Sequence, residues 1–321
     1  MIRTVFMGTP SFACEQLRAL VENGAEAGIS VVGVLTQPDK PNSRGNRMIP
    51  CETKVFAEAA GLPVYQPKTL RDEAFSALLR ELDPELIVVA AYGKILPKSV
   101  LEYPRYGCIN VHGSLLPRYR GAAPIQRAMM DGERVTGVTV MYMEEGLDTG
   151  AMLAKCEVEI RDDENFGSLY ERMARAGSSL LLSVLPRLFD GTAVAQPQDD
   201  SASTYAEKID KSEYLLDFTE DAAVLCRKIR ALAPAPCAYA FLERDGGKKR
   251  IKFTAAARHP GAVPPSEAGT VIAAEKDCIT VAAGDGALDL YSLIPEGKKE
   301  MPAADFIRGR QVAPGDRFVR E

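Results

Sequence analysis

The chain has 321 residues, of which 46% are hydrophobic and 26% are charged, and its formal net charge is −5. This mixture excludes fibrous and largely disordered proteins, and the length predicts about two domains. Seven cysteines occur without CxxC spacing and no signal peptide is evident, so we expect a reduced, cytoplasmic protein. The two histidines lie far apart without a cysteine cluster, which argues against a metal site. No apolar run approaches the ~20 residues of a membrane-spanning helix, so no membrane association is expected.

The first hundred residues alternate between two kinds of segment. Gly8-Thr9-Pro10 closes the first apolar run, and there Thr9 suits the N-cap and Pro10 the first position of a helix. This alternation predicts a Rossmann-like, doubly wound and mostly parallel sheet. The first turn is not GxGxxG and no P-loop occurs, which disfavours the usual nucleotide sites. The strand-like runs cover residues 2–7, 29–35, 62–65 and 86–91, and the helix-like segments include residues 53–60 and 70–82.

A long aperiodic segment, residues 37–50, separates the second strand from the next helix. It holds three prolines and the cations Lys40, Arg44 and Arg47. A loop of this length is more often functional or mobile than a simple connector, although a plain surface insertion is the alternative.

The stretch from Gly107 to Gly121 reads as a buried strand that breaks into a loop. Asn110 and His112 are two residues apart, so on an extended strand their side chains project from the same face. Asp148 follows in a second loop and is placed to orient the imidazole. A carboxamide, an imidazole and a carboxylate are the parts of an acyl-transfer site, namely a carbonyl polariser, a proton carrier and an orienting group. Ligands of open α/β sheets bind at the carboxyl ends of strands, where Tyr92 also falls.

The remaining elements predict a second, smaller domain. A long amphipathic helix over residues 165–189 ends at a domain edge, after which a polar stretch reads as a linker. Short strand-like segments with regular turns then predict a small β-barrel of OB-like type. We therefore expect a catalytic domain at residues 1–190, a linker at residues 191–208 and a barrel domain at residues 209–321.

The charge of the second half is uneven. Residues 190–221 hold 2 Lys/Arg and 9 Asp/Glu, whereas residues 222–258 hold 9 Lys/Arg and 2 Asp/Glu. A basic segment can bind a polyanion despite a negative total charge, and a solvated face is the alternative. The candidates for sequence-independent phosphate binding are Arg227, Lys228, Arg230, Lys248, Lys249, Arg250 and Lys252.

Two motifs carry a resemblance to a known family. The run INVHGSLLPRYRGAAPIQ at residues 109–126, followed by GLDTG at residues 146–150, resembles the signature of folate-dependent formyltransferases. The resemblance extends over almost the whole chain and is strongest to the branch that acts on methionyl-tRNA. Supporting segments are FMGTP at residues 6–10, VLTQPD at residues 34–39, AYGKILP at residues 91–97 and TYAEKI at residues 204–209.

This resemblance implies an enzyme that transfers the formyl group of 10-formyltetrahydrofolate to the α-amine of initiator methionyl-tRNA, without a metal and as a monomer. Asn110, His112 and Asp148 match the family's catalytic positions. The folate-contacting segment matches Ser114, Leu115, Leu116 and Pro117, and Tyr92 and Gly93 are candidates for the wall of the folate pocket. The implied tRNA contacts are Arg44 and Arg47 in the aperiodic loop and Lys248, Lys249 and Arg250 in the barrel.

The chain departs from the family in the parts implied to contact tRNA. Ser43-Arg44-Gly45-Asn46-Arg47 stands where Gly-Arg-Gly and more lysine are usual, and the chain has no Trp. Three alternatives remain open at this point: formylation of a small amine such as an amino sugar, hydrolysis of formyl-folate, and a non-catalytic tRNA-binding module.

Overall fold

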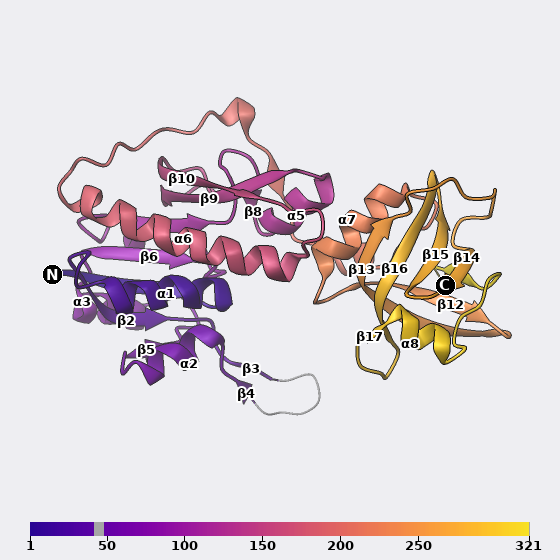
Figure 1. The fold of residues 1–321 in the computed structure, drawn as a ribbon. Helices are drawn as coiled ribbons and strands as arrows, with labels where there is room; N and C mark the ends of the chain where they lie inside the picture. Colours follow the sequence, from indigo (N-terminus) through magenta and orange to yellow (C-terminus); the bar gives the residue numbers. More distant parts are fainter. Residues whose placement is uncertain (42–47, 321) are drawn as a thin grey trace. The chain divides into compact units, whose positions relative to one another are not determined.

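The computed structural model describes residues 1–41 and 48–320, which fold into two compact units (Figure 1). The first unit consists of Met1–Pro124, Val135–Glu159 and Tyr170–Ala206. The second consists of Ile125–Arg134, Ile160–Leu169 and Glu207–Glu321. Two segments from before residue 190 therefore pack with the second unit. No helix among the described residues is long and apolar enough to cross a membrane.

A seven-stranded sheet forms the centre of the first unit, in the order β10-β9-β7-β6-β1-β2-β5. The five strands from β7 to β5 are parallel, whereas β9 runs antiparallel to β7 and β10 antiparallel to β9. The prediction of a mostly parallel, doubly wound sheet is thus confirmed, with an antiparallel pair added at one edge. The strands are β1 (Ile2–Gly8), β2 (Ile29–Leu35), β5 (Val64–Tyr65), β6 (Leu86–Ala90), β7 (Cys108–His112), β9 (Val135–Tyr142) and β10 (Met152–Glu159).

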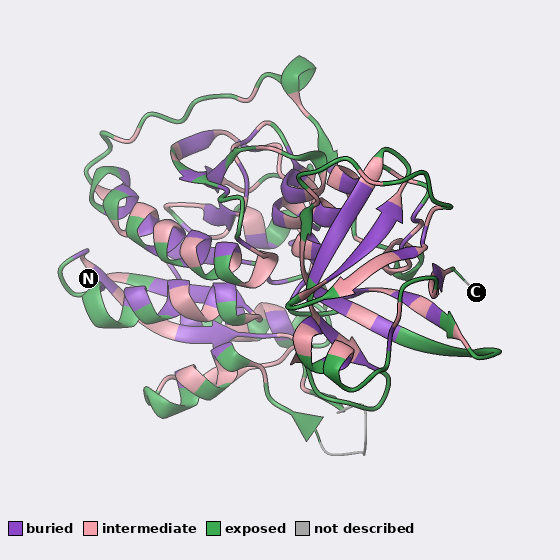
Figure 2. Cartoon of the chain, turned by 45° about the vertical axis from the view of Figure 1, so that its right-hand side comes forward, coloured by how far each residue is buried: buried purple, intermediate pink, exposed green. Residues whose placement is uncertain are grey.

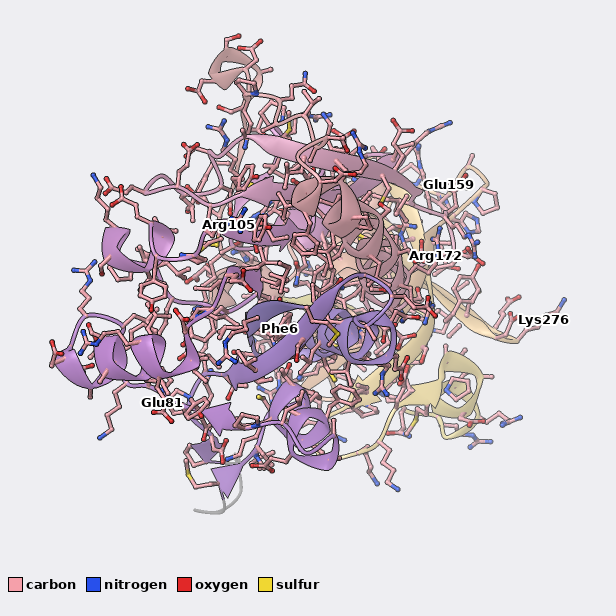
Figure 3. The ribbon with its side chains drawn as sticks, turned by 90° about the vertical axis from the view of Figure 1, so that its left-hand side faces the viewer. Phe6, Glu81, Arg105, Glu159, Arg172 and Lys276 are labelled. Carbon is pink, nitrogen blue, oxygen red and sulfur yellow. The ribbon has the colours of Figure 1, made fainter. Side chains whose placement is uncertain are left out.

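Helices cover both faces of this sheet because its strands are apolar on both sides. On one face, α1 (Ser11–Asn23) and α6 (Phe166–Phe189) lie side by side, and Gln16 Nε2 donates to the Ala174 carbonyl at 2.8 Å (Figure 1). On the other face, α3 (Glu73–Leu82) and α4 (Lys98–Leu101) bury their apolar residues against β1 and β6. Phe6 lies inside this layered core, whereas Glu81 points outward from α3 (Figure 3).

The start of α1 differs from the sequence-based expectation. Pro10 is the N-cap and Thr9 is not, because the chain stays extended through Pro10, with φ −79° and ψ 177°. The Thr9 hydroxyl instead accepts a hydrogen bond from the backbone N–H of Gln37 at 3.2 Å. Thr9 therefore ties the carboxyl end of β1 to the carboxyl end of β2, and the N-cap prediction was wrong.

The aperiodic segment contains a short hairpin at its base. β3 (Lys40–Pro41) pairs antiparallel with β4 (Met48–Ile49), and α2 (Glu52–Ala59) follows. Arg44 and Arg47, the predicted tRNA contacts of this loop, lie outside the described residues.

The second unit is built on a curled antiparallel sheet, which agrees with the predicted small β-barrel. Its order is β14-β15-β16-β13-β12-β18, and an isolated bridge between Thr270 and Arg317 joins the two outer strands at one end. The sheet comprises β12 (Ala238–Arg244), β13 (Gly247–Arg258), β14 (Val271–Glu275), β15 (Cys278–Ala283), β16 (Gly286–Pro295), β17 (Met301–Pro302) and β18 (Arg317–Val319). The unit's helices include α5 (Pro124–Asp131), all of which except Pro124 belongs here, α7 (Ala222–Leu232) and α8 (Ala303–Arg308).

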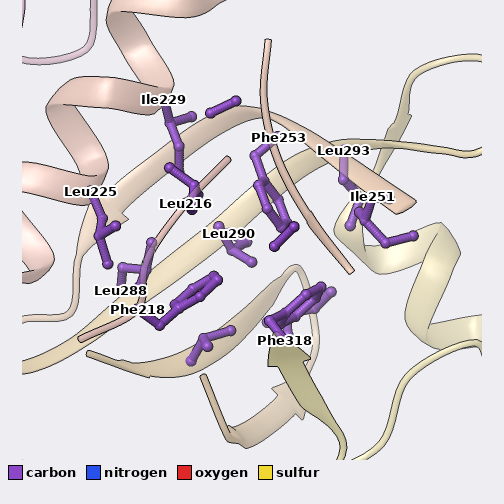
Figure 4. Packing of buried hydrophobic residues seen from close by; sticks show 14 of the residues in the cluster. Leu216, Phe218, Leu225, Ile229, Ile251, Phe253, Leu288, Leu290, Leu293 and Phe318 are labelled. Carbon is purple, nitrogen blue, oxygen red and sulfur yellow. The ribbon is translucent and has the colours of Figure 1, made fainter. Parts of the chain in front are cut away.

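Three phenylalanines form the middle of this unit's core (Figure 4). The ring of Phe318 lies 5.4 Å from that of Phe253 and 5.8 Å from that of Phe218, measured between centroids. Leucine and isoleucine side chains from α7 and the inner face of the sheet surround them. The far end of the β12–β13 hairpin, by contrast, is exposed (Figure 2). The curled sheet thus encloses a well-filled interior, and the far end of its β12–β13 hairpin is solvated.

Candidate active site

Strand β7 carries two of the predicted catalytic side chains, and both are buried. Asn110 pairs with Met141 of β9 and with Val89 of β6, so it sits between two neighbouring strands. His112 ends the strand opposite Thr139. The Asn110 carboxamide has no hydrogen-bond partner among the residues that the structure describes, although Asn110 is only 8% exposed. Its N–H groups therefore remain available to a ligand.

Both ring nitrogens of His112 face oxygen atoms. Nε2 lies 2.9 Å from the carbonyl oxygen of Tyr119, and Nδ1 lies 3.6 Å from Oδ2 of Asp148. A carbonyl oxygen can only accept, so Nε2 must carry the hydrogen of this bond. The neutral ring consequently presents the lone pair of Nδ1 toward the Asp148 carboxylate. The structure thus brings together the histidine and the aspartate that the sequence placed 36 positions apart.

The Asp148 carboxylate is held by backbone as well as by the ring. Its Oδ2 accepts a hydrogen bond from the Gly121 N–H at 2.9 Å. Asp148 also adopts a left-handed backbone conformation, φ +53°, which residues other than glycine rarely take. Its side chain is 12% exposed, compared with 6% for that of His112.

The loop after β7 is fastened by a buried threonine. The Thr139 hydroxyl donates to the Ser114 carbonyl at 2.7 Å and accepts from the Leu116 N–H at 3.1 Å. Lys155 Nζ donates to the Leu116 carbonyl at 3.1 Å. These bonds fix the loop to β9 and β10, the antiparallel pair at the edge of the sheet.

The four residues of the predicted folate segment divide into two kinds. The Ser114 hydroxyl donates to the Arg118 carbonyl at 2.7 Å, and the Leu116 side chain packs against Met141 and Met152. Ser114 and Leu116 are buried and therefore shape the loop, whereas Leu115 and Pro117 keep partly exposed surface.

Tyr92 and Gly93 follow β6 at the same edge of the sheet. The Tyr92 hydroxyl is buried and has no partner among the described residues, and burial raises the pKa of Tyr92 to about 12. Its backbone carbonyl accepts a hydrogen bond from Gln37 Nε2 at 3.0 Å. Gly93 is exposed and has a φ of +77°, a conformation that glycine adopts without strain.

Sequence reasoning missed the residues that connect the two loops of the site. Gln198 Nε2 donates to the carbonyl oxygens of Asp148 and Gly150, both at 2.8 Å. Arg120 donates to Gln198 Oε1 from Nε at 3.0 Å and from Nη2 at 2.8 Å. Gln198 lies in the polar stretch predicted as a linker, where no motif or periodicity marks one residue above another.

The basic residues of the second unit differ in whether their charged groups are free to bind phosphate. Arg227 donates to the Met130 carbonyl, Lys228 pairs with Glu220, and Arg230 donates to the carbonyls of Arg161 and Asp162. These three side chains form hydrogen bonds or ion pairs within the second unit. Lys248, Lys249 and Arg250 are exposed at the end of the β12–β13 hairpin, where Arg250 lies 3.6 Å from Glu296.

Comparisons with known proteins agree with this architecture. Residues 2–185 match the formyl transferase family and residues 208–311 match the formyl transferase C-terminal domain. A methionyl-tRNA formyltransferase from Bacillus licheniformis is 45% identical over 316 residues, which cover 98% of this chain and 97% of the relative.

Solved structures share the fold at low sequence identity. WlaRD, a sugar 3N-formyl transferase solved in the presence of dTDP and 5-N-formyl-THF, is 17% identical with a TM-score of 0.66, over 93% of this chain and 99% of WlaRD. HypX from Aquifex aeolicus, solved in complex with tetrahydrofolic acid, is 17% identical with a TM-score of 0.63. That match covers 95% of this chain and 47% of HypX, so the chain spans about half the length of HypX.

Thr139→Val should destabilise the first unit by about 1–3 kcal/mol, because it leaves the Ser114 carbonyl and the Leu116 N–H without their partner. Chemical denaturation measures the change in unfolding free energy. Thr136→Val is the matched control, since Thr136 is buried on the same strand and its hydroxyl has no hydrogen bond among the described residues. Equal stability of the two variants would contradict the role given to Thr139.

Proposed function

The chain belongs to the formyl transferase family, and on that premise we propose that it transfers the formyl group of 10-formyltetrahydrofolate to the α-amine of initiator methionyl-tRNA. The extent of the match to the Bacillus licheniformis enzyme supports this substrate. The observation that carries the proposal is the cluster of Asn110, His112 and Asp148 at the carboxyl end of a central strand. We propose these three as the catalytic residues.

Asn110 has the role of carbonyl polariser. When an amine attacks a formyl carbon, negative charge develops on the formyl oxygen, and a preorganised N–H donor stabilises that charge. The Asn110 carboxamide is buried and makes no hydrogen bond among the described residues, so it donates to the new charge without first breaking a bond. Removal of one such donor costs about 10²–10³-fold in rate in other acyl transfers.

His112 and Asp148 take up the proton that the amine loses. The bond between the formyl carbon and the folate nitrogen then breaks, and tetrahydrofolate leaves with a proton on that nitrogen. Nε2 is committed to the Tyr119 carbonyl, so Nδ1 is the nitrogen that is free to take a proton. A proton at Nδ1 lies beside Asp148 Oδ2, whose negative charge balances the positive charge of the ring. Once Nδ1 is protonated, Asp148 accepts its hydrogen and orients the ring, so the pair works as a general base and its positioning group.

The residues beside the cluster fit a folate donor, which supplies the formyl group when bound. The partly exposed surfaces of Leu115 and Pro117 provide apolar contact. Tyr92 is buried in the hydrophobic cluster beneath this edge of the sheet, so it supports the wall from within. Gly93 has no side chain to narrow the approach. Ser114 and Leu116 stabilise the conformation of this segment through a hydrogen bond and through apolar packing, respectively.

We propose that residues 1–190 act as the catalytic domain and residues 209–321 as the tRNA-binding domain. Residues 191–208, the predicted linker, include residues 196–206, and these are bonded to the first unit. Lys248, Lys249 and Arg250 are exposed on one projecting hairpin, which suits sequence-independent phosphate contacts. Arg44 and Arg47 remain proposed contacts of the acceptor end. A cytoplasmic monomer is the proposed working form, and the seven free thiols suit a reducing compartment.

His112→Ala and Asp148→Asn should each reduce kcat by about 10²–10⁴-fold, because each removes part of the proton-transfer pair. The measurement is transfer of formyl from formyl-folate to charged methionyl-tRNA, with uncharged tRNA, free methionine, an amino sugar and water as competing acceptors. His259→Gln, which changes the other histidine in the second unit, should retain wild-type transfer. Near-normal single-turnover transfer by either site variant would refute the catalytic assignment, and transfer to water or the amino sugar alone would refute the substrate.

The affinity for methionyl-tRNA should fall steeply as salt rises, because phosphate contacts release bound counterions. Lys248→Ala with Lys249→Ala should lower the slope of log K against log salt by roughly 1–2. Lys208→Ala with Lys211→Ala, two exposed lysines outside the hairpin, serves as the charge-matched comparison. A flat salt dependence of the wild type, or equal slopes for both double variants, would contradict the hairpin assignment.

A further inference from the structure

The polar stretch from Gln196 to Ala206 is fastened along its length to the two loops of the site. Gln196 forms a backbone bridge with Met152, with both N–H···O distances at 2.8 Å. At the other end, β11 (Tyr205–Ala206) pairs in parallel with β8 (Arg120–Gly121). A segment that makes these bonds is part of the first unit's structure.

The side chain of Gln198 uses both of its polar atoms within this arrangement. Its Oε1 accepts two hydrogen bonds from Arg120, which has only donors, so the orientation of the carboxamide is unambiguous. Its Nε2 then faces two carbonyl oxygens, those of Asp148 and Gly150. Gln198 thereby spans the loop that carries Asp148 and the segment that carries Arg120.

The same stretch also fixes the backbone groups that touch His112 and Asp148. The Thr204 hydroxyl accepts from the Tyr119 N–H at 2.8 Å, and the Thr204 carbonyl accepts from the Arg120 N–H at 2.9 Å. Tyr119 supplies the carbonyl for His112 Nε2, and Gly121 supplies the N–H for Asp148 Oδ2. The partners of the two side chains are therefore set by bonds from residues 198–206.

We propose that Gln198 is a positioning residue that holds Asp148 in place against His112. This inference rests on the proposed function of the pair. Asp148 has a left-handed backbone, φ +53°, which is uncommon for residues other than glycine, and the two bonds from Gln198 Nε2 help to hold it. Without the two bonds from Nε2, the loop relaxes and the carboxylate moves away from Nδ1. A displacement of about 1 Å at a reacting group can cost up to roughly 10²-fold in rate.

Gln198→Ala and Gln198→Glu test this role in steady-state formyl transfer to methionyl-tRNA. Glutamate keeps the size of the side chain and its contact with Arg120, but it loses the N–H donors. Both variants should lose roughly 10- to 100-fold in kcat while KM for either substrate stays within about twofold. Gln196→Ala is the matched control, because Gln196 is exposed and engages Met152 through its backbone alone; it should match the wild type.

A double-variant comparison separates positioning from general stability. If Gln198 acts through Asp148, then adding Gln198→Ala to Asp148→Asn should reduce kcat no further. An unchanged kcat in Gln198→Ala, recovery of kcat in Gln198→Glu, or a full additional loss in the double variant would each overturn the inference. Failure of the proposed function would look different, since the wild type itself would then not formylate methionyl-tRNA.

Discussion

The site depends on one hydrogen bond, from Nε2 of His112 to the backbone carbonyl of Tyr119. A backbone carbonyl cannot donate, so this bond fixes which ring nitrogen carries the hydrogen and turns Nδ1 toward Asp148. Tyr119 itself has a left-handed backbone, φ +59°, which aims its carbonyl at the ring. Contacts that fix the backbone near Tyr119 therefore also fix the orientation and the tautomer of the His112 ring.

The fold supplies that support from three directions. The parallel strands β6 and β7 place Tyr92, Asn110 and His112 at one edge of the sheet, where their carboxyl ends meet. The antiparallel pair β9 and β10 fastens the following loop through Thr139 and Lys155. The stretch that contains Gln198 and Thr204 forms hydrogen bonds to residues 119–121 and 148–150 or to their side chains, and it holds these two segments together. Strands β9 and β10, which are the antiparallel exception in a mostly parallel sheet, therefore hold a loop of the site in place.

Local patterns predicted most of the fold and the core of the site, whereas non-local bonds escaped prediction. Apolar runs located β2 and β6 closely, and strand alternation placed Asn110 and His112 on one face. The partners of Gln198 lie 48–78 positions away, and no local pattern encodes such contacts. For the same reason the cations of α7 read as a phosphate-binding surface, although carbonyls from other segments bind Arg227 and Arg230.

The hydrogen bond from His112 Nε2 to the Tyr119 carbonyl is tested most directly by determining the tautomer of His112. Only one other histidine occurs, so a His259→Gln variant labelled with ¹⁵N gives imidazole signals from His112 alone. At a pH where the ring is neutral, long-range ¹H–¹⁵N correlation spectra should show the hydrogen on Nε2 and a bare Nδ1. A neutral ring with its hydrogen on Nδ1 would mean that the bond to Tyr119 is absent, and it would contradict the arrangement from which the proposed mechanism follows.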